Sequence, residues 1–295
     1  MKIYDCTTFY SEHMMLDIRF NILNKNVDKF IVVESLYSHS GIKKKLNFDI
    51  NNYQKFKDKI IYLIIDKEPK DTINNQNNLI TPEIKRFNSI KRIEQSYDYM
   101  SEGIKDAHDE DLIMISDNDE IPNLNSIKFK KSKKNFIIFK QLLFYYKFNL
   151  LYDVMPWFGS KACKKKNLKS FSNLKNLKNK KYPVWRLDTF FSNFKKINLD
   201  IVDDGGWHFT NIKSPEDLYE KMSNFGHHDE FESSNLTLQD LKNNINNKTV
   251  FYDHFADKSS KNKWDYNYKL KNINMDLLPK YLIDNNEKYK EWFDI

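Results

Sequence analysis

The stretch Leu112-Ile-Met-Ile-Ser-Asp-Asn-Asp-Glu-Ile-Pro122 decides the expected fold. It opens with a continuous apolar run of the length of a buried strand, and carboxylates follow at once. Two further apolar runs, at residues 30–34 and 60–66, also end in an acid. Strands that are apolar throughout are typical of a parallel sheet whose two faces are both covered. The three runs therefore predict an α/β fold with a mostly parallel central sheet.

Helical signals separate and follow these strands. Apolar residues recur near helical spacing in residues 14–23, and Pro82 suits the first turn of a helix that extends to about residue 104. Ser214-Pro-Glu-Asp217 combines a capping serine, a proline and an acid, and Thr237 with Asp240 repeats this pattern more weakly. The tail, residues 276–295, is expected to pack on the body as helices.

The composition is that of a folded, basic chain. Hydrophobic residues make up 40% of the 295 residues, which excludes a disordered chain, and the net charge of +7 favours anionic partners without choosing among them. The two cysteines, Cys6 and Cys163, exclude a disulfide framework and a multi-cysteine zinc site, although one bridge is possible. No stretch resembles a signal peptide or a membrane span, so we expect a cytoplasmic protein.

Asp117, Asp119 and Glu120 are the strongest chemical signal. Carboxylates crowded at the end of a buried strand repel one another unless a cation neutralises them. Mg²⁺ or Mn²⁺ accepts such oxygen ligands and leaves positions open for a diphosphate. Because ligands of parallel sheets bind at the carboxyl ends of the strands, we expect a metal site here. The alternative, acids that merely end a strand at a solvated edge, explains Asp66 better than this cluster.

A second cluster is Asp203-Asp204-Gly205-Gly206-Trp207-His208-Phe209. The glycine pair would allow a ligand to approach the backbone closely, the tryptophan could stack on a sugar, and the histidine could bind a metal or a phosphate. A tight turn followed by a core tryptophan is the alternative interpretation.

A third cluster, His227-His228-Asp229-Glu230, follows the helix that Ser214 begins. Its imidazoles and carboxylates offer a general base or a further metal ligand. The histidines lack the spacing of a helical zinc pair. Solvated polarity at a helix end is the competing explanation.

Taken together, these blocks resemble glycosyltransferase family 17, which contains β-1,4-mannosyl-glycoprotein β-1,4-N-acetylglucosaminyltransferases. They occur in family order over about residues 1–231. The matching blocks are Tyr4-Asp-Cys-Thr-Thr-Phe-Tyr-Ser-Glu12, Leu16-Asp-Ile-Arg19, Val27-Asp-Lys-Phe-Ile-Val-Val-Glu34, Ile113-Met-Ile-Ser-Asp-Asn-Asp-Glu-Ile-Pro122, Trp157-Phe-Gly159 and Gly206-Trp-His-Phe209.

The resemblance implies a GT-A (Rossmann-like) nucleotide-sugar transferase fold in a single catalytic domain, residues 1–295. Residues 1–125 would form the nucleotide-sugar-binding half, and residues 126–295 the acceptor-binding half with the C-terminal helices. It also implies a UDP-sugar donor, UDP-GlcNAc in characterised relatives, a divalent metal (Mn²⁺ or Mg²⁺) and inversion at the anomeric carbon.

The resemblance and the chemistry of inversion together suggest roles for particular residues. Asp117 and Asp119 would be the Asp-x-Asp element, with one carboxylate on the metal and the other on the ribose or a metal-bound water. An inverting transferase needs a base for the acceptor hydroxyl. The candidates for that base are Asp204 and Glu230, and Asp229 is a third choice. The remaining expected contacts are Glu34 with the nucleotide, Arg86 and Arg92 with the pyrophosphate, His208 with the metal or diphosphate, and Trp207 with a sugar.

The expected acceptor is a glycan or glycolipid, because the membrane anchor of animal relatives is missing. No nucleic acid is expected as a partner. The basic stretch from Lys161 to Lys181 is interpreted as a surface excursion that could touch an anionic membrane. Two other functions are kept open: a metal-dependent phosphoesterase or nuclease, and a sugar-binding protein of the same fold without catalysis.

Overall fold

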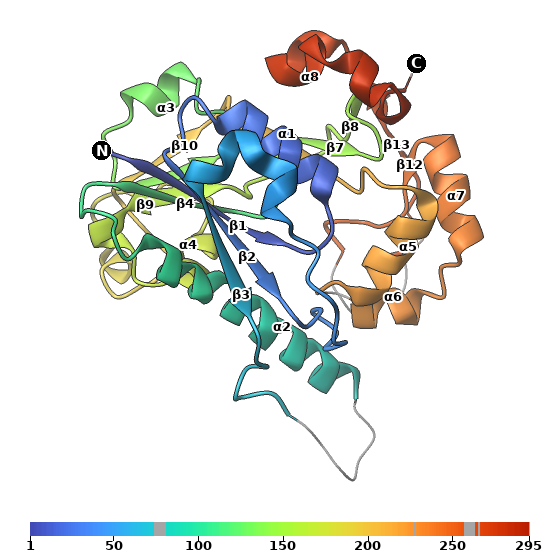
Figure 1. Ribbon diagram of the computed structural model, residues 1–295, viewed down its shortest axis with the longest axis horizontal. Helices are drawn as coiled ribbons and strands as arrows, with labels where there is room; N and C mark the ends of the chain where they lie inside the picture. The colour runs from blue at the N-terminus through green and yellow to red at the C-terminus, as the bar shows by residue number, and fades with distance from the viewer. Residues whose placement is uncertain (74–80, 227, 257–262, 265, 295) are drawn as a thin grey trace.

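A computed structural model describes residues 1–73, 81–226, 228–256, 263–264 and 266–294, and it contains a seven-stranded sheet (Figure 1). In order across the sheet the strands are β10 (Leu199–Val202), β6 (Phe136–Phe139), β9 (Lys161–Lys164), β4 (Leu112–Ser116), β1 (Ile3–Phe9), β2 (Lys29–Ser35) and β3 (Ile60–Ile65). Every neighbouring pair is parallel except the two pairs that β9 makes. The expected α/β fold with a mostly parallel sheet is confirmed.

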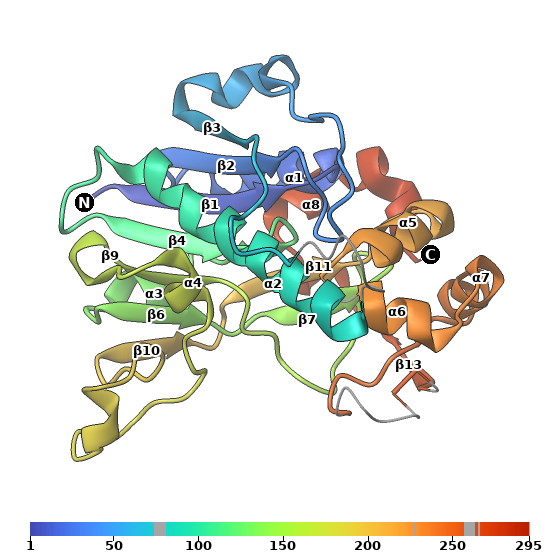
Figure 2. The same ribbon diagram turned by 90° about the horizontal axis from the view of Figure 1, so that it is seen from below.

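Both faces of this sheet are buried (Figure 2). On one face lie α1 (His13–Leu23), α3 (Ile127–Lys131), α8 (Lys280–Asp284) and the 3₁₀ segments Ile50–Lys59 and Asn286–Trp292; on the other lie α2 (Pro82–Asp98), the 3₁₀ segment Tyr99–Ile104 and α4 (Phe171–Lys175). Along β2, Phe30 and Val32 join the first core, whereas Ile31 and Val33 join the second. This alternation explains why the strand is apolar at every position.

A second, five-stranded sheet extends the molecule beyond the first. Its order is β14 (Lys271–Asn272), β8 (Leu150–Leu151), β7 (Leu142–Tyr145), β11 (Gly206–Thr210) and β5 (Glu120–Pro122). Packed beside it are α5 (Pro215–Asn224), α6 (His228–Ser234), α7 (Leu238–Asn247) and the paired strands β12 (Thr249–Val250) and β13 (Tyr268–Lys269). A third core lies between this sheet and these helices.

The expected helix starts are confirmed by their caps. Ser214 accepts a hydrogen bond from the Asp217 amide at 3.1 Å, with Pro215 in the first turn of α5. Thr237 and Asp240 form a reciprocal capping box at the start of α7.

The other short 3₁₀ segments are Lys165–Asn167, Leu187–Thr189 and Met275–Leu277. The Asn-rich residues 74–78 lie outside the described residues.

The sequence analysis identified only β2, β3 and β4 among the seven strands of the large sheet, and two of the central strands were not predicted. β1 occupies a central position between β2 and β4, and β9 lies between β4 and β6. The view of residues 161–181 as a surface excursion was therefore wrong for the part up to α4, because Ala162, Cys163 and Phe171 are buried. Cys6 and Cys163 are both free and buried. Since the large sheet combines strands from residues 1–125 and 126–295, the two halves share one sheet, and the division between them stays a prediction.

No helix among the described residues is both long and apolar enough to cross a membrane.

Candidate active site

A cavity of about 450 Å³ opens at the carboxyl ends of β1, β2 and β4 and extends along β7, β11, α5 and α6. Thr8, Ser35 and Asp117 mark the ends of the three strands on its wall. In a parallel sheet this edge collects the loops that hold ligands. The cavity therefore lies where the sequence analysis expected the site.

The acidic turn, residues 117–119, connects β4 of the first sheet to β5 of the second. The Glu120 amide donates to the Asp117 carbonyl at 3.0 Å, and the Phe209 amide donates to the Asp119 carbonyl at 2.8 Å. Asp117 and Asp119 both line the cavity. One short turn thus fixes two carboxylates on the same wall.

A buried ion pair supports this turn from below. Arg19 on α1 and Asp5 on β1 are fully buried and form two hydrogen bonds, at 2.5 and 2.8 Å. The same guanidinium donates to the carbonyl oxygens of Glu120, at 2.7 Å, and Asp117, at 3.2 Å. Because a planar guanidinium holds its donors in a fixed arrangement, Arg19 ties α1, β1 and the acidic turn together. Both residues lie in blocks that carry the family resemblance, but no role was predicted for either.

Glu120 is a structural acid of this site rather than an open ligand. Its side chain accepts hydrogen bonds from the Asp117 amide at 2.8 Å and from Trp157 Nε1 at 2.7 Å, and it pairs with Lys175. Burial alone would raise the pKa of Glu120, but Lys175 and His208 together lower the pKa. A Cβ on Gly159 would lie 2.0 Å from the carboxylate, so this position requires glycine.

Asp117 keeps one carboxylate oxygen on Tyr97 and the other near Lys175. The Tyr97 hydroxyl donates at 2.9 Å, and Lys175 Nζ lies 3.1 Å away. Burial is the main cause that raises the pKa of Asp117; the charges of Glu120 and Asp119 add to it, and Lys175 opposes it. A further positive charge near this carboxylate would therefore be favourable.

Asp119 faces two nitrogen groups. His208 Nε2 lies 3.4 Å from one carboxylate oxygen, and Lys221 Nζ lies 3.7 Å from the other. Burial opposes ionisation, but His208 and Lys221 outweigh it and lower the pKa of Asp119. The His208 ring stacks at a tilt on Trp157, with centroids 4.6 Å apart. The structure thus brings His208 to the Asp-x-Asp element, as the sequence analysis expected.

The oxygen donors of the acidic turn fit a hard divalent cation in part. Among the described residues, no group of three or more His, Cys, Asp or Glu side chains is already placed to hold a metal ion. However, Asn118 Oδ1 is buried without a hydrogen-bond partner on the cavity wall, between Asp117 and Asp119. Two carboxylates and an amide oxygen suit Mg²⁺ or Mn²⁺, which takes its other ligands from water and substrate phosphates.

Of the three predicted base candidates, Glu230 lies in the cavity wall. It pairs with Lys263 at 2.6 Å on the side of the cavity formed by α6. Asp229 is not part of the wall, and its Oδ1 is buried without a hydrogen-bond partner. His228 is turned back to the Phe225 carbonyl at 3.0 Å, and His227 lies outside the described residues.

Asp204 and Trp207 are placed away from the cavity, contrary to the sequence analysis. Asp204 is exposed in the turn before β11 and accepts from Asn123 Nδ2 at 2.9 Å. Trp207 Nε1 donates to the Leu277 carbonyl at 2.7 Å and packs on the first core. The side chains of a strand alternate between faces, so His208 reaches the cavity and its neighbour cannot.

The glycine pair beside them brings backbone segments together rather than a ligand. A Cβ on Gly206, whose φ is +112°, would lie 2.2 Å from the Ile121 carbonyl, and a Cβ on Gly205 would lie 2.4 Å from the Lys140 nitrogen. The close approach that the sequence suggested is therefore between β11, β5 and the end of β6.

Glu34, Arg86 and Arg92 also have structural partners and do not line the cavity. Buried Glu34 accepts from Tyr62 at 2.8 Å and from two backbone amides, and it pairs with Lys44. Arg92 pairs with Glu68 at 2.7 Å, and Arg86 donates to the Gly226 carbonyl. None of the three contacts the cavity that the sequence analysis assigned to them.

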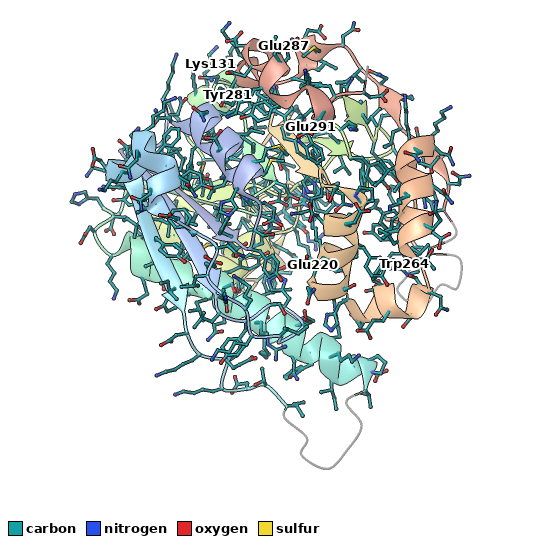
Figure 3. The ribbon with its side chains drawn as sticks, turned by 45° about the vertical axis from the view of Figure 1, so that its right-hand side comes forward. Lys131, Glu220, Trp264, Tyr281, Glu287 and Glu291 are labelled. Atoms are coloured by element: carbon teal, nitrogen blue, oxygen red, sulfur yellow. The ribbon has the colours of Figure 1, made fainter. Side chains whose placement is uncertain are left out.

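Aromatic residues at two ends of the cavity were not predicted. Tyr10, Tyr37 and His39 line it beyond β1 and β2, where burial lowers the pKa of His39 to about 4. At the other end lie Tyr252, whose hydroxyl bonds His254, and Trp264, which Figure 3 places near α6 and α7. These residues are scattered along the chain without a motif, so only the fold brings them together.

The fold and the site define a class: α/β proteins with an acidic ligand cavity at the carboxyl edge of a mostly parallel sheet. Within it, the family model for glycosyltransferase family 17 matches residues 1–293, so this chain belongs to glycosyltransferase family 17. The suspected family is confirmed.

Comparisons with individual proteins add little. No curated protein matches the chain. The inositol-1-phosphate CTP transferase from T. maritima is 11% identical, with 76% of this chain and 96% of that chain covered and a TM-score of 0.35. HddC from Yersinia pseudotuberculosis, complexed with GMP-PN, is 13% identical, with 75% and 97% covered and a TM-score of 0.31. Similarity at this level supports no conclusion about chemistry.

Proposed function

We propose that this family 17 protein is a metal-dependent, inverting glycosyltransferase with a GT-A fold, which transfers GlcNAc from UDP-GlcNAc to a hydroxyl of a glycan or glycolipid. One observation carries the proposal: Asp117 and Asp119 share the wall of a single cavity at the carboxyl edge of the sheet. Its size suits a ligand larger than a monosaccharide, because small-molecule sites are typically about 300–1,000 Å³.

The uridine would lie at the β1 and β2 end of the cavity. Tyr10 and Tyr37 offer aromatic faces for a base, while the hydroxyls of Thr8 and Ser35 offer polar contacts. The diphosphate would then reach the acidic turn near Asp117 and Asp119. This arrangement assigns recognition of the nucleotide to residues that the sequence analysis did not select.

Asp117 and Asp119 would hold the divalent cation, with Asn118 Oδ1 close by. When bound, such a cation screens the diphosphate and stabilises it as a leaving group. Lys221 and Lys175 lie on either side of the acids and supply fixed positive charge to the same region. The chain's own residues would thus orient the donor and neutralise part of its charge.

Glu230 is our choice for the general base. In an inverting transfer, the base takes the proton of the acceptor hydroxyl while that oxygen bonds to the anomeric carbon and the bond to the diphosphate breaks. Glu230 lines the same cavity from a different element, α6, whereas the acidic turn joins β4 to β5. Tyr252 and Trp264 on the same side are suited to bind the apolar faces of acceptor sugars.

Thermal unfolding in the presence of nucleotide sugars tests the proposal. We expect UDP-GlcNAc with Mn²⁺ to raise the melting temperature more than UDP-GlcNAc with EDTA, and more than GDP- or CMP-sugars. Asp119→Ala should abolish this gain, whereas the control Asp204→Ala should keep it, because Asp204 is exposed outside the cavity. Release of UDP from UDP-GlcNAc, followed in the same samples, reports turnover.

The absence of protection by every nucleotide under every metal would refute nucleotide-sugar binding. Equal protection with EDTA and with Mn²⁺ would refute metal dependence but keep the donor. Protection by a UDP-sugar other than UDP-GlcNAc would overturn only the donor assignment.

A further inference from the structure

Residues 178–196 form a projecting segment next to β10, which Figure 2 shows in yellow, extended away from the sheet. Its neck is closed by a backbone hydrogen bond of 2.8 Å from the Lys178 amide to the Phe194 carbonyl. The neck is anchored to the body because Lys161, on β9, donates to the Leu177 carbonyl at 2.7 Å. The segment therefore has a defined attachment to the central sheet.

Large apolar side chains are unusually exposed in this segment. Five of them lie within eight residues and are each at least 71% exposed: Val184, Trp185, Leu187, Phe190 and Phe191. Among the described residues elsewhere, only Met1 reaches this exposure. Isolated exposed apolar residues are ordinary, but a contiguous group marks a surface that binds something.

The polar groups of the segment are turned toward each other instead. Asp188 forms two hydrogen bonds with Arg186, at 2.7 and 2.8 Å, and pairs with Lys195 at 2.6 Å. Thr189 is buried and donates to the Arg186 carbonyl at 2.6 Å. These local bonds hold the backbone of the segment in shape while the apolar side chains point outward. The exposure is thus built into the loop and does not follow from a lack of structure.

Charge identifies the kind of surface that fits. Residues 178–196 contain six Lys or Arg and one acid, which gives +5 of the chain's net +7. The single acid, Asp188, is already paired with two cations. Aromatic rings with lysines around them are the combination that settles at the boundary of a lipid bilayer, where rings enter the headgroup region and lysines meet lipid phosphates.

We propose that residues 178–196 bind the surface of an anionic lipid bilayer. Trp185, Phe190 and Phe191 enter the headgroup region, and Lys178 and Lys180 bind acidic headgroups beside them. This inference rests on the exposed side chains of the segment alone and does not depend on the transferase chemistry. It also moves the expected membrane contact from residues 161–181 to a segment that begins at Lys178, after α4.

Flotation of the full-length protein with lipid vesicles tests the proposal. We expect binding to vesicles of phosphatidylcholine mixed with phosphatidylglycerol, and much weaker binding to phosphatidylcholine alone. Phe190→Ser combined with Phe191→Ser should weaken binding by about tenfold or more, because both rings lose their place in the headgroup region. Lys178→Glu combined with Lys180→Glu should weaken binding to the mixed vesicles by a similar factor.

The matched control is Phe255→Ser combined with Leu277→Ser, two exposed apolar residues outside the segment. It should bind vesicles as the unchanged protein does. The melting temperature of each variant shows whether it is folded. If the Phe190→Ser/Phe191→Ser variant does not fold, the Lys178→Glu/Lys180→Glu variant still tests the proposal. Equal flotation of all variants, or binding indifferent to acidic lipid, would overturn the proposal. If the unchanged protein does not float but forms dimers as its concentration rises, and the Phe190→Ser/Phe191→Ser variant does not, the segment would instead bind a second copy of the chain.

Discussion

The acidic turn at residues 117–119 and the turn at Asp203 and Asp204 look alike in sequence but differ in what surrounds them. Each follows a strand of the same sheet, and β4 and β10 point in the same direction. However, β4 is a central strand and β10 an edge strand three places away. Asp117 and Asp119 enter the cavity, whereas Asp203 is 65% exposed and pairs with Lys128 at 2.6 Å. Position in the sheet therefore matters more than the local pattern of acids.

The largest expected contrast concerns the base. Glu230→Gln should lower sugar transfer to the best saccharide acceptor by about 100- to 10,000-fold, because the proton of the attacking hydroxyl loses its acceptor. Donor protection in the thermal assay should persist. Asp204→Asn should change turnover by less than about twofold, since it lies outside the cavity. Loss of transfer in the Asp204 variant, with a normal Glu230 variant, would reverse the assignment.

A pair of lysines compares the two turns directly. Lys175 is 13% exposed and contacts both Asp117 and Glu120, whereas Lys128 is 43% exposed and contacts Asp203. Removing one partner of a buried ion pair costs about 3–5 kcal/mol. Lys175→Met should therefore lower the free energy of unfolding by about that amount, and Lys128→Met by about 0–1 kcal/mol. Urea denaturation measures both, and equal effects would mean that the acidic turn is more solvated than its contacts indicate.

Two tryptophans allow a hydrogen bond inside the site to be compared with one outside it. Trp157 donates to the buried carboxylate of Glu120, and Trp207 donates to the neutral Leu277 carbonyl, both at 2.7 Å. Trp157→Phe should cost about 1.5–3 kcal/mol of stability, and Trp207→Phe about 0.5–1.5 kcal/mol, because hydrogen bonds to charged groups contribute more. Only Trp157→Phe should weaken donor protection. A loss of protection in the Trp207 variant would indicate that the tail also shapes the site.

The effect of pH on the free energy of unfolding should have opposite signs for Asp117 and Asp119. The lowered pKa of Asp119 means that its contribution to stability is present above the unfolded value of 3.8 and is lost as pH falls through the folded pKa. Asp119→Asn should therefore be less stable than the unchanged protein at neutral pH, and the difference should shrink in acid. Asp117, whose pKa is raised, has the opposite sign, so Asp117→Asn should be as stable or more stable at neutral pH.

The exposed Asp203 provides the control for this titration. Lys128 lowers its pKa too, but across a solvated pair. The effect of Asp203→Asn should therefore be small and should vanish at high salt, while that of Asp119→Asn should persist. Denaturation curves at several pH values and two salt concentrations distinguish these outcomes.

Three of the seven strands of the large sheet could be predicted, because apolar runs and caps are local signals. β2, β3, β4 and the helices that begin at Pro82 and Pro215 follow from residues adjacent in sequence. β1 was missed because its seven residues, Ile3–Phe9, include Asp5 and two threonines, so its run is broken by polar side chains. The buried partner of Asp5 is Arg19, and that pairing is not visible in the sequence.

The site could be predicted in part from its motifs. Asp117, Asp119 and His208 meet in the cavity, as the sequence suggested, but Asp204 and Trp207 do not. Strand alternation and sheet order decide between them, and neither is encoded in the residues next to the motif. Lys175 was hidden for the same reason, since it reaches the acids from α4, which is remote from them in the sequence.

The acidic turn belongs to both sheets, because β4 ends in one and β5 begins in the other. Because this connection is short and is also bonded to Arg19, we expect the two sheets to keep their relative orientation when a ligand binds. We therefore expect any closing movement around a bound molecule to come from α5, α6 and the side chains that line the cavity. The strand ends on the cavity wall would then stay fixed, while the residues that α5 and α6 contribute would adjust to a ligand.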